Sequence, residues 1–150
     1  MKTYKGRTAV GGPVVEGEAI VSTMPFGFFG GVNPKTGVII DKWHDLYNQR
    51  IKGKIFVYPE GRGSTVGAAV MLELARTGSA PLAVVNNLCE IISATGCVLA
   101  KKFYDYDLPM LERFDTDITQ VIKTGDRVRV NPKAGTIEIL HQRTGEEDKQ

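Results

Sequence analysis

The sequence predicts a single α/β domain that is rich in strands and has few helices. Glycine is abundant, with 17 residues, and it clusters at 11–12, 27–31 and 61–67, where the chain is expected to turn. Between these clusters lie short runs of β-branched residues, which favour strands. Few segments have helical character, so a regular alternation of strands and helices is not expected. A length of 150 residues is also the usual size of one domain.

Six segments are expected to be strands. Residues 81–86 are apolar enough to lie in the interior of a sheet. Residues 126–130 and 136–140 alternate polar and apolar side chains around the turn 131–135, which predicts a hairpin with one face toward solvent. The full set of expected strands is 19–22, 37–40, 54–58, 81–86, 126–130 and 136–140.

Three segments are expected to be helical. The clearest is 66–77, where apolar residues recur four positions apart and Gly78 provides a C-terminal stop. A second helix is predicted over 88–100, although Gly96 interrupts it and glycine weakens a helix interior. Residues 115–123 are expected to add a short helical turn.

Composition and charge narrow the class of protein. The hydrophobic fraction of 42% and the charged fraction of 24% are those of a globular protein. The net charge of +2 arises from mixed basic and acidic residues without a basic stretch, which argues against nucleic acid as the partner. No apolar run approaches the roughly 20 residues of a membrane helix, and no apolar leader follows Met1. We therefore expect a cytoplasmic protein without a membrane contact.

The two cysteines and the C-terminal tail carry weaker expectations. Cys89 and Cys97 are expected to be buried structural thiols in a reducing compartment. Two cysteines cannot supply the three or four ligands of a zinc site or an iron–sulfur cluster, so no metal or cofactor is expected on this chain. Residues 141–150 are polar and are expected to form a frayed tail after a domain spanning 1–140.

The main chemical signal is the stretch Gly61-Arg62-Gly63-Ser64-Thr65, which joins a predicted strand to a predicted helix. A glycine-rich turn before a helix offers free backbone N–H groups and the positive end of the helix dipole to an anion. Arg62 adds a forked donor that suits a carboxylate or a phosphate. This pattern predicts an anion site at the start of the helix.

Two known motifs do not match this stretch, and one plain alternative is left. A phosphate-binding P-loop requires a lysine before the hydroxyl residue, and none precedes Ser64 or Thr65. A nucleophile elbow requires G-x-S-x-G, which Gly63-Ser64 does not satisfy. The plain alternative is that Ser64 or Thr65 only caps the helix.

Over most of its length the sequence resembles the aconitase X family, specifically its swivel domain or small subunit. The match is an ordered series of short segments, which is more specific than any one of them. These segments are Val15–Ala19, Phe28–Gly37, Ile39–Asp41, His44, Ile51–Lys54, Pro59–Gly67, Ala80–Pro81, the region of Gly96, and Thr124–Asp126.

The resemblance implies a β/β/α swivelling fold and a larger partner subunit that holds an iron–sulfur cluster through its own cysteines. It also implies a hydro-lyase that removes water from a hydroxy acid. Archaeal members act on mevalonate 5-phosphate and bacterial members on cis-3-hydroxy-L-proline, so both substrates stay open. By match to the family's G-R-G-S segment, Ser64 is expected to be the catalytic base. The residues expected to bind substrate are Gly61, Arg62, Gly63, Thr65, Phe29, Gly30, Gly31, Asn33 and His44.

Several of these assignments have plainer alternatives. The segment 28–33 either lines the substrate pocket, docks on the partner, or is a simple turn. Asp41 and His44 either orient substrate or play a structural part. Asn86 and Asn87 end a predicted strand and either face a cleft or form a turn. The rival for the whole chain is a non-catalytic anion-binding or assembly module.

Overall fold

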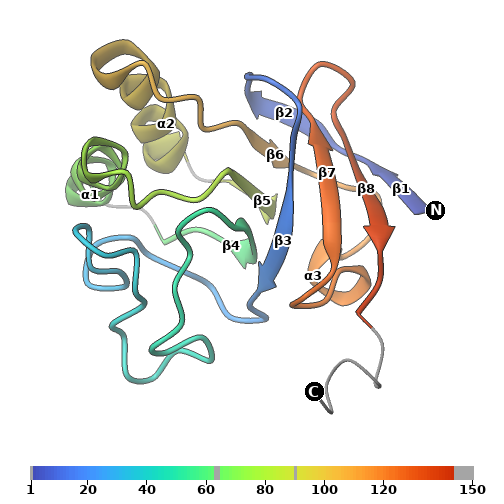
Figure 1. Cartoon of the computed structure of the whole chain (residues 1–150), viewed down its shortest axis with the longest axis horizontal. Coiled ribbons are helices and arrows are strands. Elements are labelled where there is room, and N and C mark those ends of the chain that lie inside the picture. Colours follow the sequence, from blue (N-terminus) through green and yellow to red (C-terminus); the bar gives the residue numbers. More distant parts are fainter. Residues whose placement is uncertain (1, 63–64, 90, 144–150) are drawn as a thin grey trace.

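The computed structural model describes residues 2–62, 65–89 and 91–143, so Gly63, Ser64 and most of the predicted tail lie outside the described residues. Within these ranges the chain forms eight strands and three helices (Figure 1). In chain order they are β1 (Lys2–Lys5), β2 (Arg7–Val10), β3 (Val15–Val21), β4 (Ile55–Glu60), α1 (Thr65–Thr77), β5 (Ala83–Leu88), α2 (Ile91–Tyr104), β6 (Met110–Glu112), α3 (Ile118–Val121), β7 (Arg127–Asn131) and β8 (Thr136–His141).

The strands form one continuous sheet in the order β1-β8-β7-β3-β4-β5-β6-β2. Strands β3, β4, β5 and β6 are parallel, and the remaining pairs are antiparallel. β1 and β2 are consecutive in the chain yet lie at opposite ends of this order, joined by Gly6. A Cβ atom at Gly6 would meet the backbone oxygen of Glu112 at 2.5 Å, so the corner requires glycine. The sheet is therefore folded over so that its two ends meet.

This folding produces three layers. The ribbon β1-β8-β7 covers one face of the parallel strands, and α1 and α2 cover the other face (Figure 1). A hydrophobic core lies on each face of these strands. Side chains alternate along β4, so Ile55 and Val57 pack in the core under the ribbon, whereas Phe56 and Tyr58 pack in the core under the helices. The β/β/α arrangement implied by the resemblance is confirmed.

Helix α1 confirms the predicted helix at 66–77, and α2 starts three residues later and ends four residues later than predicted. Gly96 does not interrupt α2. A Cβ atom there would lie 3.0 Å from Cβ of Met71 and 3.3 Å from Cα of Ala68, both on α1. Gly96 thus allows a close approach of the two helices, and this packing outweighs its weak helix propensity.

The prediction of a strand at 37–40 is wrong. These residues form only isolated bridges, Val32 with Ile39 and Val38 with Arg50, inside the long connection between β3 and β4. Gly37 has a φ of +74°, and a Cβ atom there would lie 2.6 Å from the backbone oxygen of Ser79. The turn against the end of α1 prevents an extended strand. Three short strands, β1, β2 and β6, were not predicted.

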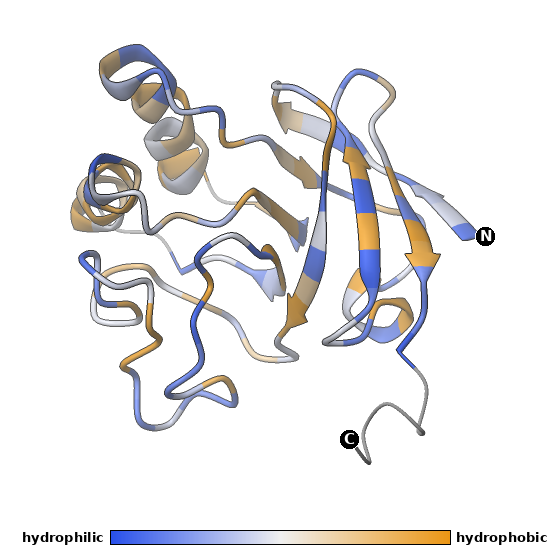
Figure 2. Ribbon diagram, in the orientation of Figure 1, coloured by the Kyte–Doolittle hydropathy of each residue, from blue (hydrophilic) through white to orange (hydrophobic). Residues whose placement is uncertain are grey.

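The hairpin β7–β8 is confirmed, and Figure 2 shows the expected alternation of hydrophobic and hydrophilic residues along it. The short helix α3 falls within the predicted turn at 115–123. Asp117 caps it by accepting a hydrogen bond from the backbone N–H of Thr119. Hydrogen bonds from the Asn87 amide and from Thr119 lower the pKa of Asp117 below its usual value.

Candidate active site

The candidate site lies where parallel strands of the sheet end. β4 runs through Glu60 into the predicted anion loop and then into α1, while the chain leaving β3 returns beside it. In open α/β sheets the carboxyl ends of the strands are the usual place for a ligand crevice. The topology therefore brings the predicted site segment 28–33 and the residues Gly61 and Arg62 to one edge.

Backbone hydrogen bonds join the chain just before segment 28–33 to the end of β4 and to Arg62. The N–H of Phe26 donates to the oxygen of Glu60 at 3.0 Å, and the N–H of Arg62 donates to the oxygen of Phe26 at 2.9 Å. Phe26 and Gly61 form a parallel bridge that continues the pairing of the strands. The buried Phe26 ring packs edge-on against Phe28, with ring centroids 5.0 Å apart. The position of the 25–31 loop is therefore fixed relative to Arg62.

Glycine is required at the tightest points of this loop. A Cβ atom at Gly31 would lie 2.1 Å from the backbone oxygen of Gly27 and 2.9 Å from the Phe26 ring. Gly30 has a φ of +77°, a conformation that other residues rarely adopt. A Cβ atom at Gly27 would lie 3.2 Å from the backbone oxygen of Arg62. These close approaches shape the loop around a hollow.

The hollow is a cavity of about 320 Å³ that opens to solvent. It unites five of the predicted substrate-binding residues and also includes Asp41, which the sequence offered as a secondary candidate. Its lining consists of Pro25, Phe26, Gly27, Phe29, Gly30, Gly31, Asp41, His44 and Arg62. Arg62 is exposed, and Phe29 is 64% exposed beside it, so a cation and an aromatic face are both available to a ligand.

The other predicted site residues lie elsewhere. Gly61 forms the bridge to Phe26 behind the lining. Asn33 accepts a hydrogen bond from the backbone N–H of Lys35 in a local turn, and it is absent from the cavity lining. Thr65 is the first residue of α1, and its side chain, like all of Gly63 and Ser64, lies outside what the structure describes.

His44 is only 6% exposed, and both of its ring nitrogens are engaged within the chain. Nδ1 accepts a hydrogen bond from the backbone N–H of Leu46 at 3.2 Å, which assigns the proton of the neutral ring to Nε2. Nε2 lies 3.2 Å from Oγ of Ser22, which in turn donates to Asp45 at 2.7 Å. Nδ1 also lies 3.2 Å from Oδ1 of the same Asp45 carboxylate.

This buried arrangement explains how the cavity wall keeps its shape. The ring of His44 packs edge-on against Phe26, with centroids 5.4 Å apart. Sequence reasoning identified His44 but missed its supports Ser22 and Asp45, because no local pattern links residues at the end of β3 to a turn more than twenty positions later.

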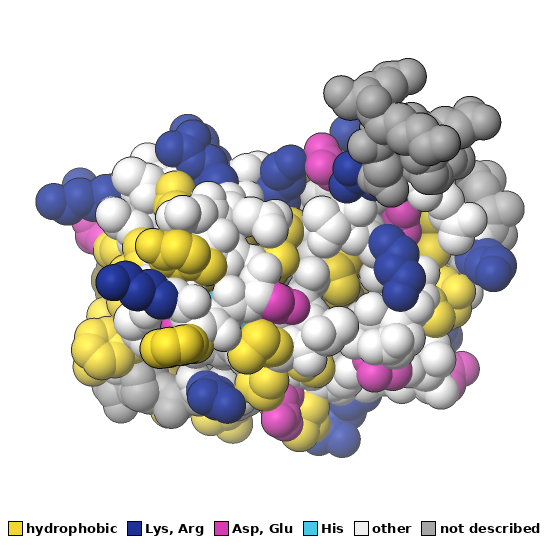
Figure 3. All heavy atoms as spheres, turned by 90° about the horizontal axis from the view of Figure 1, so that it is seen from below, with side chains coloured by type: hydrophobic (Ala, Val, Ile, Leu, Met, Phe, Trp, Pro, Cys, Tyr) yellow, Lys and Arg dark blue, Asp and Glu magenta, His cyan; other side chains and the backbone are white. Residues whose placement is uncertain are grey.

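Large hydrophobic side chains are exposed around the cavity. Trp43 is 89% exposed, and Met24, Ile40 and Tyr47 of the same connection are partly exposed. Figure 3 shows the face seen from below in Figure 1, where hydrophobic side chains lie close to basic ones. A surface of this kind is suited to contact with another protein.

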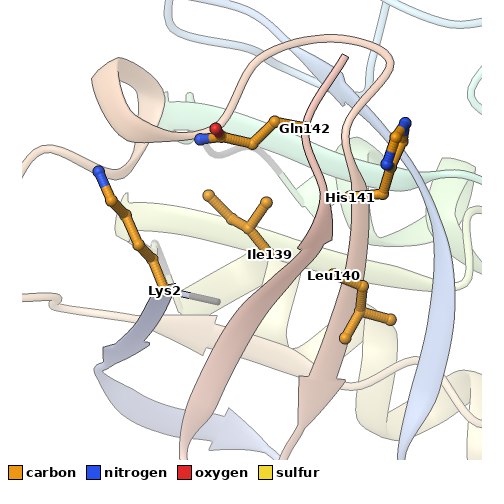
Figure 4. Close-up of a pocket in the computed structure, with 5 residues that line it drawn as sticks. All are labelled: Lys2, Ile139, Leu140, His141 and Gln142. Atoms are coloured by element: carbon orange, nitrogen blue, oxygen red, sulfur yellow. The ribbon is translucent and has the colours of Figure 1, made fainter. Parts of the chain in front are cut away.

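A second hollow of similar volume, about 330 Å³, lies at the opposite side of the molecule. Its lining comes from β1 and the end of β8, and Ile139 lies between Lys2 and Gln142, while His141 points away from them (Figure 4). It lies on the ribbon itself, and its ionisable lining residues are Lys2 and His141. Among the described residues, none of the predicted site residues lines this second hollow.

The described part of the chain does not assemble a metal site. Within residues 2–62, 65–89 and 91–143, no group of three His, Cys, Asp or Glu side chains lies close enough to hold a metal ion. Cys97 is fully buried as predicted, whereas Cys89 is only partly buried. None of the described helices has the length and apolar character needed to cross a bilayer.

Comparison with known proteins gives consistent matches. Residues 3–139 match the family model described as the aconitase X swivel domain. The phosphomevalonate dehydratase small subunit of Methanocaldococcus jannaschii is 46% identical over 138 residues, covering 92% of this chain and 98% of that protein. The same subunit of Methanosarcina mazei is 38% identical over 146 residues, covering 97% and 96%. A crystal structure of Thermococcus kodakaraensis aconitase X in its holo-form matches with a TM-score of 0.84 and 42% identity, covering 94% of this chain and 100% of that one.

Proposed function

The chain belongs to the aconitase X swivel-domain family and is a dehydratase subunit, and we propose that it is the small subunit of an enzyme that dehydrates mevalonate 5-phosphate. The observation that carries the proposal is the cavity at the carboxyl ends of the parallel strands. Its lining includes Arg62 and the glycine loop 29–31, and Arg62 precedes the first residue of α1 by three positions in the sequence. The partner is a large subunit that closes this cavity.

Elimination of water from a hydroxy acid requires two events at neighbouring carbons. A base removes a proton beside the carboxylate, and the hydroxyl group leaves from the next carbon. We assign the base to Ser64, which follows Arg62 by two positions and precedes α1. A free serine is too weak a base in water, so its alkoxide needs donors such as the N–H groups at the helix start and the Arg62 guanidinium. Exclusion of water by the large subunit would strengthen these interactions.

The iron–sulfur cluster is assigned to the large subunit. The sequence has two cysteines, and the described residues offer no group of ligands for a cluster. The Lewis acid for the leaving hydroxyl is accordingly a contribution of the partner. This chain's own share is to bind the acid group, hold the base and shape one wall of the pocket.

The choice of substrate rests on the relatives and on the charge of the site. Each of the two curated relatives described above is a phosphomevalonate dehydratase small subunit. Mevalonate 5-phosphate carries a carboxylate and a phosphate, and the forked donor of Arg62 suits either group. Asp41 in the same lining would oppose an anion, so we place the anionic group on the Arg62 side of the cavity.

Replacement of Ser64 tests the assignment of the base. Ser64→Ala, co-purified with the large subunit, should lose dehydration of mevalonate 5-phosphate while the two subunits still assemble. The matched control is Ser79→Ala, which removes a buried hydroxyl that donates to the backbone oxygen of Lys35 at the other end of α1. The control should lower stability and keep turnover. Retained turnover in Ser64→Ala would refute the role of the base.

Assay of the two-subunit complex with both family substrates separates the alternatives. Turnover of cis-3-hydroxy-L-proline without turnover of mevalonate 5-phosphate would reassign the substrate. A non-catalytic anion-binding module would instead bind its ligand tightly as an isolated chain and gain nothing from the partner.

A further inference from the structure

A layer of polar side chains crosses the parallel strands just below the candidate site. In register, Phe56 pairs with Val84, and Val84 pairs with Met110, which gives an apolar and fully buried row facing α1 and α2. Two residues further along, Tyr58 pairs with Asn86, and Glu112 stands at the corresponding end of β6. All three are at least 96% buried. The core therefore changes from apolar to polar at its last layer before the site.

The side chains of Tyr58 and Glu112, on either side of Asn86 in this layer, each have contacts within the chain. The Tyr58 ring packs against the ring of Phe26 in the cavity wall, with centroids 5.8 Å apart. The Glu112 carboxylate accepts a hydrogen bond from the backbone N–H of Cys89 at 3.0 Å, and Arg7 and Arg113 lie within 4 Å of it.

The central member, Asn86, is different. Its side chain is 0% exposed, and neither its amide nitrogen nor its amide oxygen has a hydrogen-bond partner within the described chain. Buried amides in folded proteins are almost always satisfied, because leaving one unpaired forfeits its hydrogen bonds to water. Because none of the described residues pairs with this amide, its partner must be a group from outside them.

The position of Asn86 indicates what that group is. The side chain lies on the helix side of β5, two residues before the strand ends. α1 and α2 begin beyond the ends of β4 and β5, so the positive ends of two helices lie at the edge toward which this layer leads. Neutral amide donors beside helix N-termini complement an anionic oxygen.

We propose that Asn86 is a further substrate-binding residue of the dehydratase, and that its amide N–H donates to an anionic oxygen of the substrate in the assembled enzyme. This inference rests on the proposed function and names one more ligand of the same site. The oxygen belongs either to the carboxylate or to the phosphate, and the two sources are separable by experiment.

The central test replaces Asn86 in the two-subunit complex. Asn86→Leu removes the unpaired amide with little change of volume, so we expect the Tm of the full chain to rise by about 2–4 °C. In the complex, kcat/KM for mevalonate 5-phosphate should fall about 100-fold. A purely structural residue would not combine higher stability with lower activity. Full activity in Asn86→Leu would overturn the proposal.

Asn87 supplies a matched control on the opposite face of the same strand. Its amide donates to Asp117 at 2.8 Å and accepts from the backbone N–H of Ile118 at 2.9 Å. Asn87→Leu should lower the Tm by a similar amount and keep kcat/KM within about twofold, because this amide is satisfied inside the chain. Equal loss of activity in both variants would show a shared structural effect and overturn the proposal.

A binding measurement covers the case in which Asn86→Leu folds poorly, and it is independent of the proposed reaction. Asn86→Asp keeps the shape but replaces the donor with a carboxyl group. Inorganic phosphate and mevalonate, which lacks the phosphate, are each added to the wild-type complex and to both variants in a thermal-shift assay. We expect one of the two to stabilise the wild type and to lose this effect in both variants, which identifies the oxygen.

The two proposals fail in distinguishable ways. A wild-type complex that does not dehydrate mevalonate 5-phosphate would refute the proposed function, while the thermal-shift measurement would still decide the role of Asn86. An unchanged shift in both variants, or a wild type that neither anion stabilises, would overturn the assignment of Asn86.

Discussion

The two sides of the parallel strands differ in how their shape is specified. The ribbon β1-β8-β7 is regular, and its alternating side chains pack a fully buried row that includes Val128, Val130 and Ile137. The connection between β3 and β4 has only isolated bridges, and its shape is set by glycines and by contacts between distant backbone segments. Among the described residues, the irregular side forms the cavity that is lined by five of the predicted site residues.

Stability and chemistry therefore depend on different regions of the molecule. The regular ribbon contributes burial of apolar surface, which stabilises the fold without requiring a particular geometry. The irregular connection instead fixes a few polar and aromatic groups at one edge. Variants in the ribbon should therefore change unfolding, and variants at the edge should change turnover. The four predictions that follow test this division.

The largest effect is expected in the ribbon. Ile137→Ala removes a fully buried side chain and should lower the free energy of unfolding by about 2–5 kcal/mol. Denaturant titration of the chain measures the loss, and kcat of the folded complex should stay unchanged. A matching fall in kcat would show that the ribbon takes part in the chemistry, which would contradict the proposed division between the two regions.

At the edge, Arg62→Ala should lower kcat/KM of the complex by about 100-fold while the Tm of the chain changes little, because Arg62 is exposed. Arg62→Lys should recover part of the activity, since the charge stays but the forked geometry is lost. Arg129→Ala in the ribbon, which breaks contacts with Glu16 and Glu138, is the control and should keep full activity. Equal behaviour of the two arginine variants would remove the distinction between the regions.

Gly31→Ala tests whether close backbone approach shapes the cavity. The added Cβ atom would meet the backbone oxygen of Gly27, so we expect a loss of about 1–3 kcal/mol in the free energy of unfolding together with lower turnover. At Gly11 a Cβ atom has no neighbour within 4 Å among the described atoms, and Gly11→Ala should be close to neutral. Chemical denaturation of both variants provides the measurement, and an intact Gly31→Ala would contradict the tight loop.

The smallest effect concerns the cap of α3 and depends on pH. Asp117→Ala should cost about 1 kcal/mol at neutral pH. Because the pKa of Asp117 in the folded chain is below its usual value of 3.8, the carboxylate stabilises the fold above that pH and loses this contribution as the pH falls through the folded pKa. The stability difference between wild type and variant should therefore narrow below about pH 4. A constant difference from pH 7 to pH 2.5 would argue against the ionised cap.

Regular elements could be predicted because their signals are local. The hairpin followed from alternation, and α1 followed from apolar spacing and from the stop at Gly78. The strand at 37–40 failed because the turn at Gly37 is imposed by its contact with Ser79, which is 42 positions away. Gly96 weakened the prediction of α2 because its reason, the contact with Met71, lies on another helix.

Single residues of the candidate site could be predicted from the sequence, but the contacts that hold them together could not. Arg62, Phe29 and His44 could be selected from the sequence, and the structure places them around one cavity. The supports of His44 and the polar layer at Asn86 could not be assigned, because they depend on strand register and on which face of β5 each residue occupies. The role of Ser64 stays a prediction that the proposed variants test.

The corner at Gly6 has a consequence for how the chain avoids aggregation. Residues 2–10 supply both outermost strands, so one short stretch covers the hydrogen-bonding rims of β8 and β6 at the same time. Loss of these residues would leave backbone N–H and C=O groups of both β8 and β6 unpaired. Strand edges exposed in this way pair with strands of neighbouring molecules. Residues 2–10 thus cover the outer edges of β8 and β6 while lying outside the lining of the candidate site.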